Sequence, residues 1–133
     1  MSLDLLPPAA IPPKTQGLRH VFAAAGYSAA GFRWMLREAA FRHELLAGGV
    51  TLAAFALVRV PLVHALVQIG LLLMLLALEA VNTAIERIVD RLSPDFSLFA
   101  KEAKDLGSFA VFCLLALNAL SATVFLYGAI HGG

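Results

Sequence analysis

Four polar residues form a stripe in a chain that is otherwise strongly apolar: Glu79, Asn82, Glu86 and Asp90. They follow an apolar run at residues 61–78, at intervals of three, four and four. At about 100° per residue, all four lie on one helix face. Carboxylates at the edge of a membrane span are costly to bury, so they indicate a functional site. Their oxygens suit Mg²⁺, a hard cation. The stripe therefore predicts a functional site at the end of a membrane-spanning helix.

The composition requires a surface that faces something other than water. Of the 133 residues, 60% are apolar and only 14% are charged, against roughly 25% charged residues in a soluble domain. This length suits one domain. The single cysteine, Cys113, excludes an internal disulfide and a cysteine-rich zinc site, and we expect it to be buried or lipid-facing. Residues 1–14 are proline-rich and lack a continuous apolar core, which predicts a flexible tail and no secretory signal.

Three apolar runs without a charge supply the spans. They hold 14, 18 and 23 residues, at 45–58, 61–78 and 108–130. A spanning helix needs about 20 residues. The first run reaches that length by extension upstream, and the second by extension through the polar stripe. We therefore expect an all-α membrane protein in which residues 15–133 form one domain. Its spans are predicted at about 39–58, 61–90 and 106–130, with a tight antiparallel hairpin between the first two.

The basic residues predict the orientation of the chain. Nine of the ten fall on one side of three such spans, and only Arg59 falls on the other. The side with more lysine and arginine is normally cytoplasmic. We therefore expect the N-terminus and the acidic stripe in the cytoplasm and the C-terminus outside. Residues 15–37 predict an amphipathic helix at the membrane surface, with Trp34 at the interface and a bend near Gly26 and Gly31.

Several motifs stand in order along the chain. E-A-A-F-R-H-E starts at Glu38, E-A-V-N-T-A-I-E at Glu79, V-D-R at Val89 and A-K-D-L-G-S at Ala103. Together they resemble the prokaryotic diacylglycerol kinase family of small integral-membrane lipid kinases, and in particular its Gram-negative type. The resemblance runs from about Arg19 to Tyr127, with residues 26–33 displaced by one position relative to their flanks.

The resemblance implies a homotrimer with three spans and a surface helix per subunit, in the bacterial inner membrane. The active site is then composed between subunits near the cytoplasmic surface. Its reaction transfers the γ-phosphate of MgATP to the hydroxyl of 1,2-diacylglycerol, which gives phosphatidic acid for phospholipid turnover. Mg²⁺ is the implied cofactor, ATP the co-substrate, and no nucleic acid takes part.

The resemblance also implies roles for individual residues. Glu79 takes the position of the general base, accompanied by Asn82 and Asp90, and Glu38 and Glu86 take those of the metal ligands. The implied nucleotide contacts are Arg19, Tyr27, Glu38, Glu86, Asp95, Phe96, Ser97, Lys104 and Asp105, with backbone groups acting at 95–97. The implied lipid contacts are Arg33, Ala40, Phe41, Arg42, His43, Glu44, Glu79 and Ser108.

The residue types suit phosphoryl transfer, which needs positioning and charge neutralisation more than covalent help. Glu38 and Glu86 can supply oxygens to Mg²⁺ if their helices approach each other, and Lys104 can pair with a phosphate. Glu79 lies about 10 Å deeper than Glu86 at 1.5 Å per residue, near a lipid hydroxyl. Asn82 lies one turn from both and can orient them. The sequence has no glycine-rich P-loop.

Other interpretations remain open at this point. The enzyme could act on undecaprenol or another lipid alcohol, or the chain could be a non-catalytic oligomeric channel or assembly subunit whose acids line a cation path. Ordinary ion pairs could also explain the charges: Glu86 with Arg87 or Asp90 with Arg91 across helices, and Glu38 with Arg42 on one surface. Lys101 to Asp105 would then form a solvated loop, and Asn118 would hydrogen-bond to another helix.

Overall fold

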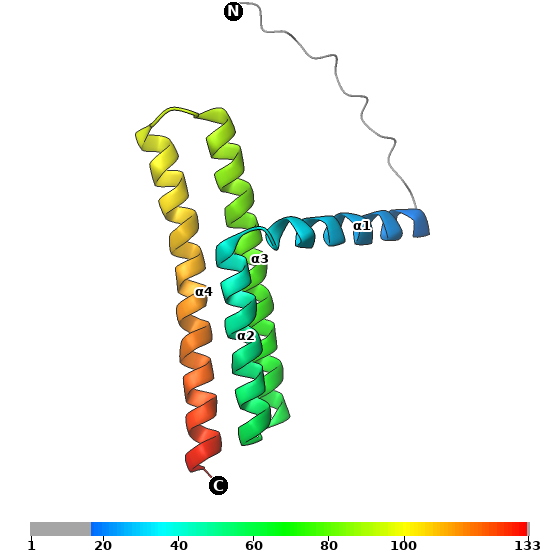
Figure 1. Cartoon of the computed structure of the whole chain (residues 1–133), viewed down its shortest axis with the longest axis vertical. Helices are drawn as coiled ribbons and strands as arrows, with labels where there is room; N and C mark the ends of the chain where they lie inside the picture. The colour runs from blue at the N-terminus through cyan, green and yellow to red at the C-terminus, as the bar shows by residue number, and fades with distance from the viewer. Residues whose placement is uncertain (1–16, 133) are drawn as a thin grey trace, which may run out of the picture. The chain divides into compact units, whose positions relative to one another are not determined.

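The computed structural model describes residues 17–132, so the expected proline-rich tail lies outside the described residues. Four helices account for most of the described chain, which contains no strand: α1 (Leu18–Met35), α2 (Ala39–Val58), α3 (Leu62–Leu92) and α4 (Leu98–His131). The all-α prediction is confirmed (Figure 1). The chain divides after Trp34 into one unit with most of α1 and a second unit with α2, α3 and α4.

The helix α1 starts after Gly17, whose φ of 68° is a left-handed conformation that glycine adopts readily. The bend predicted near Gly26 and Gly31 was wrong, because the helix is continuous over its 18 residues. Alanines precede both glycines, and alanine has the highest helix propensity, which offsets the roughly 1 kcal/mol cost of each glycine.

A short turn at residues 59–61 joins α2 to α3 and confirms the tight hairpin. Arg59 has φ 57° and ψ 47°, a left-handed C-cap whose N–H reaches the carbonyls of Phe55 and Ala56. Val60 N donates to Phe55 O at 2.9 Å. Pro61 then starts α3, where its missing N–H costs nothing because the first N–H groups of a helix have no partner within it.

The connection between α3 and α4 is much shorter than predicted. The solvated loop expected over residues 101–105 is wrong, because α4 already starts at Leu98. Ser97 caps this helix, since its Oγ accepts from Ala100 N at 3.1 Å. Lys101 pairs with Asp105 one turn later on the same helix. The turn thus occupies only residues 93–97, and α4 extends the last span toward the charged end of the unit.

Within the second unit, α3 and α4 run side by side and antiparallel, and α2 packs against both (Figure 1). Since α2 has 20 residues and α3 has 31, α3 extends roughly 16 Å past the start of α2 at 1.5 Å per residue. The charged ends of α3 and α4 thus project beyond the part of the unit where all three helices pack together.

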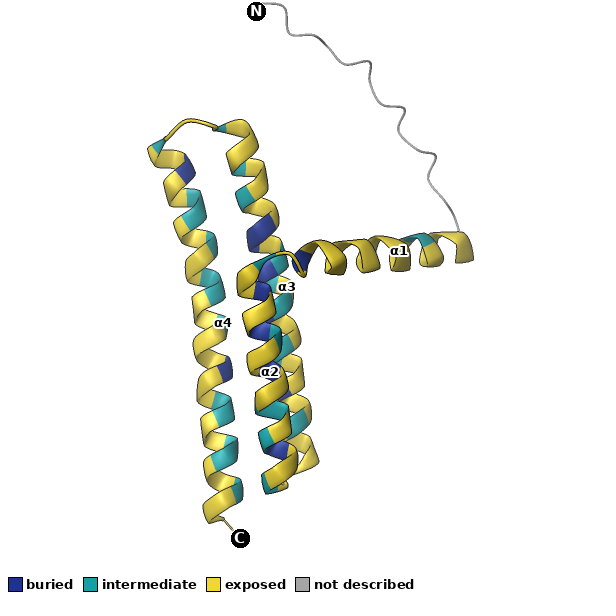
Figure 2. Ribbon diagram, viewed as in Figure 1, coloured by how far each residue is buried: buried dark blue, intermediate teal, exposed yellow. Residues whose placement is uncertain are grey.

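The second unit is apolar outside and partly polar inside. All three of its helices are long and apolar enough to cross a membrane, by length and composition. Most of their apolar side chains are exposed, as Figure 2 shows by the large exposed surface. The buried polar residues of this unit are Glu44, Gln68, Glu79, Asn82, Thr83 and Asn118. This inverted pattern is expected of helices whose outer surface meets lipid, where polar groups turn inward.

A hydrogen-bond network joins α3 to α4 in the middle of the spans. Gln68 Nε2 donates to Asn118 Oδ1 at 3.1 Å, and Ser121 Oγ donates to Gln68 Oε1 at 2.7 Å. Asn118 Nδ2 donates to the carbonyls of Leu71 and Leu114. The prediction that Asn118 bonds to another helix is confirmed. The network sets the vertical register of α3 against α4, and with it the register of the charged residues farther along both helices.

Candidate active site

Glu38 connects the start of α2 to α3. It is the N-cap residue of α2, and its Oε1 accepts from Arg87 Nη2 at 2.8 Å. The surface pair predicted between Glu38 and Arg42 is wrong, because Arg42 instead donates to the carbonyls of Leu36 and Arg37. Arg42 thereby stabilises the connection just before α2, and Glu38 is left to turn toward α3.

The polar stripe on α3 passes from the interior to the surface. Glu79 and Asn82 are buried, Glu86 is half-buried, and Asp90 is exposed. Asn82 Nδ2 donates to Glu86 Oε1 at 3.2 Å, which confirms the predicted orientation of Glu86. Among the described residues no hydrogen bond joins Asn82 to Glu79, so the same prediction for Glu79 is not confirmed. The gradient follows from the length of α3, since its last turns lie beyond the start of α2. One helix face therefore presents a deep carboxylate and a shallow one at the same site.

Four glutamates lie near the place where α2 meets α3: Glu38, Glu44, Glu79 and Glu86. Glu79 lies within electrostatic range of Glu38 and Glu86, and Glu44 lies within range of Glu79. We call these four residues the acidic cluster. Like charges in a poorly hydrated setting repel strongly, so such a cluster needs protons or cations to balance it. Arg87 supplies one cation through Glu38.

Lys104 brings α4 to the edge of the acidic cluster. Its Nζ forms an ion pair with Asp90, and Glu86 also acts on it electrostatically. The ion pair suggested between Asp90 and Arg91 is therefore replaced by one between Asp90 and Lys104. Asp105 points along α4 to Lys101, and Ser108 is exposed. An ammonium group beside the carboxylates is suited to bind a phosphate.

Gly107 allows α4 to approach the stripe. A Cβ at this position would overlap Asn82 Oδ1, so the glycine leaves the space that the amide occupies. Within residues 17–132, Asn82 Oδ1 is buried without a hydrogen-bond partner. Sequence reasoning quoted Gly107 only as part of a motif and gave Arg87 no role in the site. The role of Gly107 becomes clear only from the packing of α4 on α3, and that of Arg87 only from the packing of α2 on α3.

A cavity of about 310 Å³ lies at the turn between α3 and α4. Asp95, Phe96 and Ser97, the expected backbone contacts of the nucleotide, line it together with Asp90 and Lys104. The Ser97 hydroxyl is engaged as the helix cap, and Ser93 Oγ lies 3.0 Å from it. The turn has its backbone groups beside the ammonium group of Lys104, and their contact with a nucleotide stays a prediction.

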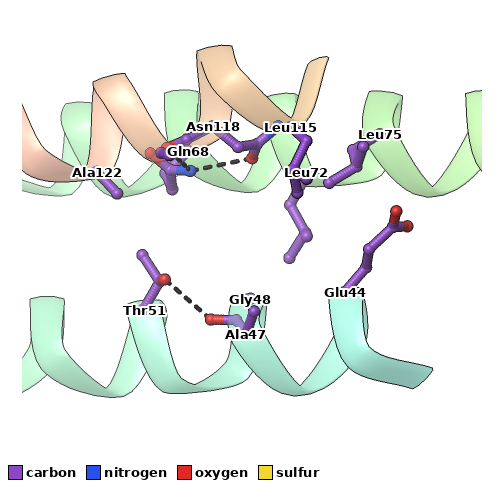
Figure 3. Close-up of a pocket in the computed structure, with 11 residues that line it drawn as sticks. Glu44, Ala47, Gly48, Thr51, Gln68, Leu72, Leu75, Leu115, Asn118 and Ala122 are labelled. Carbon is purple, nitrogen blue, oxygen red and sulfur yellow. Dashed lines mark hydrogen bonds between the residues drawn. The ribbon is translucent and has the colours of Figure 1, made fainter. Parts of the chain in front are cut away.

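A second cavity, of about 170 Å³, lies between α2, α3 and α4 on the membrane side of the acidic cluster (Figure 3). Glu44 forms one end of it and Gln68 with Asn118 the other, and most of the lining between them is aliphatic. Among the described residues, Glu44 Oε2 is buried and has no hydrogen-bond partner. Leu75, one turn from Glu79, also lines the cavity. The arrangement suits a lipid that presents a polar group to the carboxylates.

The remaining expected lipid and nucleotide contacts divide between the two units. Phe41 is buried in the second unit, whereas Ala40, Arg42 and His43 are exposed. The unit that contains α1 carries the last three of the expected contacts, all of them exposed: Arg19, Tyr27 and Arg33. The acidic cluster thus forms without any residue of α1.

The carboxylates fit Mg²⁺ only if the substrate completes the coordination. Residues 17–132 hold no group of three or more histidine, cysteine, aspartate or glutamate side chains that could bind a metal alone. Mg²⁺ usually retains waters and takes one or two carboxylates together with phosphate oxygens. Glu38 and Glu86 are hard oxygen donors at the solvent side of the acidic cluster, and Lys104 lies near Glu86. They fit an ion shared with a triphosphate.

Comparisons with known proteins identify the family of this chain. Residues 26–126 match the family described as prokaryotic diacylglycerol kinase. A diacylglycerol kinase from Sinorhizobium sp is 49% identical over 109 residues, which cover 82% of this chain and 80% of the relative. Those of Pseudomonas aeruginosa and Escherichia coli K12 are 37% and 30% identical, over 84% and 85% of this chain and 92% and 93% of theirs. The chain therefore belongs to the prokaryotic diacylglycerol kinase family.

Proposed function

We propose that this protein is an ATP-dependent diacylglycerol kinase that forms phosphatidic acid in the bacterial inner membrane. The observation that carries the proposal is the acidic cluster, which combines a deep carboxylate at Glu79 with shallow ones at Glu38 and Glu86. A lipid hydroxyl and a nucleotide approach a membrane enzyme from opposite directions. A site graded from the membrane interior to the surface suits both.

The shallow side of the site would hold the nucleotide. Glu38 and Glu86 would bind Mg²⁺ together with phosphate oxygens, and the ion would neutralise charge on the triphosphate. Lys104 would exchange Asp90 for a phosphate oxygen, because both offer an anionic partner at the same place. Arg87 holds Glu38 toward α3, and Asn82 holds Glu86. These contacts support the proposal, because they would hold both proposed metal ligands in position before the nucleotide arrives.

The deep side of the site would hold the acceptor. The lipid hydroxyl oxygen attacks the γ-phosphorus, the bond to the β–γ bridging oxygen breaks, and ADP leaves with that oxygen. The hydroxyl proton passes to Glu79. This carboxylate is buried and lies on the membrane side of the two proposed metal ligands, Glu38 and Glu86. Glu44 and the cavity beneath it would receive the part of the lipid next to the hydroxyl. The products are phosphatidic acid and ADP.

We further infer that the protein acts as a homotrimer, with its acidic cluster on the cytoplasmic side. Three helices leave most of their apolar surface exposed and enclose little interior volume, which favours assembly in the membrane. Nine of the ten basic residues of the sequence come before the first span or around the turn between the second and third spans, which favours the cytoplasmic orientation, where ATP is available. Sites near subunit contacts would then gain enclosure from neighbouring protomers.

Replacing the base tests the mechanism. Glu79→Gln keeps the size of the side chain but removes the proton acceptor, so we expect phosphorylation of diacylglycerol in mixed micelles to fall by about 10²-fold or more. Glu102→Gln, an exposed glutamate on α4, is the matched control and should keep full activity. Near-normal turnover of Glu79→Gln would contradict the role of Glu79. A parallel assay in which undecaprenol is the better acceptor would contradict the choice of lipid.

A further inference from the structure

The end of the second unit away from the acidic cluster has a separate cavity. It measures about 460 Å³ and lies between the turn that joins α2 to α3 and the last turns of α4. Six of the residues that line it matter here: Arg59, Pro61, His64, Val124, Phe125 and Ala129. None of the residues predicted to take part in phosphoryl transfer lines this cavity.

Among the described side chains at this end, the fixed charge is that of one arginine. Residues 45–78 and 106–132, which build it, contain no aspartate or glutamate. Arg59 is the only arginine or lysine among them, and in residues 17–132 no carboxylate forms an ion pair with it. An arginine at the edge of a membrane span is stabilised by pairing with an anionic group. The cavity beside Arg59 therefore favours a negatively charged ligand.

The backbone at Arg59 supports a role for its side chain. Arg59 is the only non-glycine residue with positive φ in the described chain. Glycine is the usual residue at such a left-handed helix end, because a Cβ is crowded there. Strained backbone conformations cluster at functional sites, so the conformation of Arg59 points to a function for its side chain. Arginine adds a planar cation that can hold two phosphate oxygens at once.

The walls of the cavity suit acyl chains. Val124, Phe125 and Ala129 make one side of it apolar, and His64 stacks on Phe125 with ring centroids 4.5 Å apart and planes at 1°. Phe55 supports the same ring edge-on at 6.2 Å. The neighbouring Leu57 and Leu62 are exposed. A cation next to an apolar wall matches a molecule with an anionic head and hydrocarbon chains.

We propose that this cavity binds an anionic phospholipid of the leaflet at that end, with its phosphate on Arg59 and a chain against Val124 and Phe125. The turn between α2 and α3 lies at the end of two spans, where headgroups lie. The lipid would stabilise the packing of this turn against α4. This site is distinct from the acceptor site at Glu44 and does not depend on kinase activity.

Site-resolved photolabelling tests the proposal. The protein is reconstituted in phosphatidylcholine vesicles with a trace of phosphatidylglycerol or phosphatidylcholine that carries a diazirine in one chain, and labelled peptides are identified by mass spectrometry. We expect phosphatidylglycerol to label residues 120–130 roughly tenfold more than phosphatidylcholine does, the size of one charge-assisted hydrogen-bonded contact. Equal labelling by the two lipids would overturn the proposal.

Two substitutions separate charge from fold. Arg59→Gly removes the cation but suits the left-handed backbone, so the protein should fold and keep its kinase activity while the preference for phosphatidylglycerol is lost. Arg59→Lys should retain most of that preference. Arg91→Gln, at the other end of α3, is the control with the same loss of charge and should leave labelling of residues 120–130 unchanged. A full preference in Arg59→Gly would overturn the site, as would displacement of the lipid by inorganic phosphate.

Discussion

At the scale of single residues, the orientation of Glu86 on α3 depends on a residue of α4. Asn82 donates to Glu86, and Asn82 has its place because Gly107 on α4 carries no side chain. A Cβ there would meet Asn82 Oδ1, which is the mobile end of a side chain and can rotate away. The expected effect of such a change is thus on the orientation of Glu86 more than on folding.

Gly107→Ala should therefore lower activity with little change in stability. The off-rotamer shift of Asn82 costs about 0.5–1.5 kcal/mol, which the gain of roughly 1 kcal/mol in helix propensity nearly cancels. Misplacement of a positioning group by about 1 Å can cost up to 10²-fold in rate. Kinase assays over a range of Mg²⁺ concentrations would measure the loss, and thermal unfolding in micelles would measure stability.

Gly70→Ala is the control for this change. A Cβ at Gly70 meets no described residue within 4 Å, so the same substitution gains helix propensity without a collision. It should keep full activity and be at least as stable as the wild type. Equal activity losses in the two variants would show that Gly107 acts through helix flexibility and not through Asn82.

At the scale of elements, α3 and α4 are held in register by the network around Gln68 and Asn118. A one-turn slip between the two helices would move Lys104 away from Asp90 by about 5.4 Å. The buried amides thus act on a charged pair more than twenty residues away along α3. Polar contacts of this kind in membrane helices contribute modestly to stability, at about 0.6 kcal/mol on average.

Gln68→Leu should destabilise the second unit by about 1–2 kcal/mol, because Asn118 Oδ1 loses its donor in an apolar setting and Ser121 loses one of its two acceptors. Gln68→Leu combined with Asn118→Leu should recover part of that loss, since both polar partners are then gone. Unfolding of purified protein in mixed micelles, analysed as a double-mutant cycle, measures the coupling. Additive losses would mean that the two amides do not act together.

At the scale of the whole molecule, the charges are sorted between the two ends of the spans. Within the second unit, the acidic residues and all the arginines and lysines except Arg59 lie toward one end of the spans, and Arg59 lies at the other. A bilayer holds such a chain in one orientation, because each basic residue resists transfer across the membrane. The proposed kinase reaction requires this orientation, since the acidic cluster must face ATP.

Cysteine labelling in intact cells tests the orientation. In a background with Cys113→Ala, Gly132→Cys should react with a membrane-impermeant maleimide added outside. Glu102→Cys, near the start of α4, should react only after the membrane is permeabilised. The opposite labelling pattern would place the acidic cluster outside the membrane, where cytoplasmic ATP cannot reach it. That result would contradict the proposed reaction.

The local pattern of the sequence determined much of this protein by itself. Long apolar runs in lipid have one satisfactory backbone structure, the helix, because every N–H and C=O group must be bonded within the segment. The stripe from Glu79 to Asp90 follows from helical periodicity alone. Both need only information from neighbouring residues, which is why three spans and a polar face could be predicted. The start of α4 could not, because lysines and aspartates suit a loop and an exposed helix equally.

Only the tertiary structure decided which charges meet. Glu38 pairs with Arg87 instead of Arg42, and Asp90 with Lys104 instead of Arg91. Such choices depend on the rotation and vertical register of α2, α3 and α4, which are set by Gly107, by the network at Gln68 and by the turn at Arg59. Helical periodicity shows on which face of its own helix a residue lies. The partner of that residue depends on how two separate helices pack together.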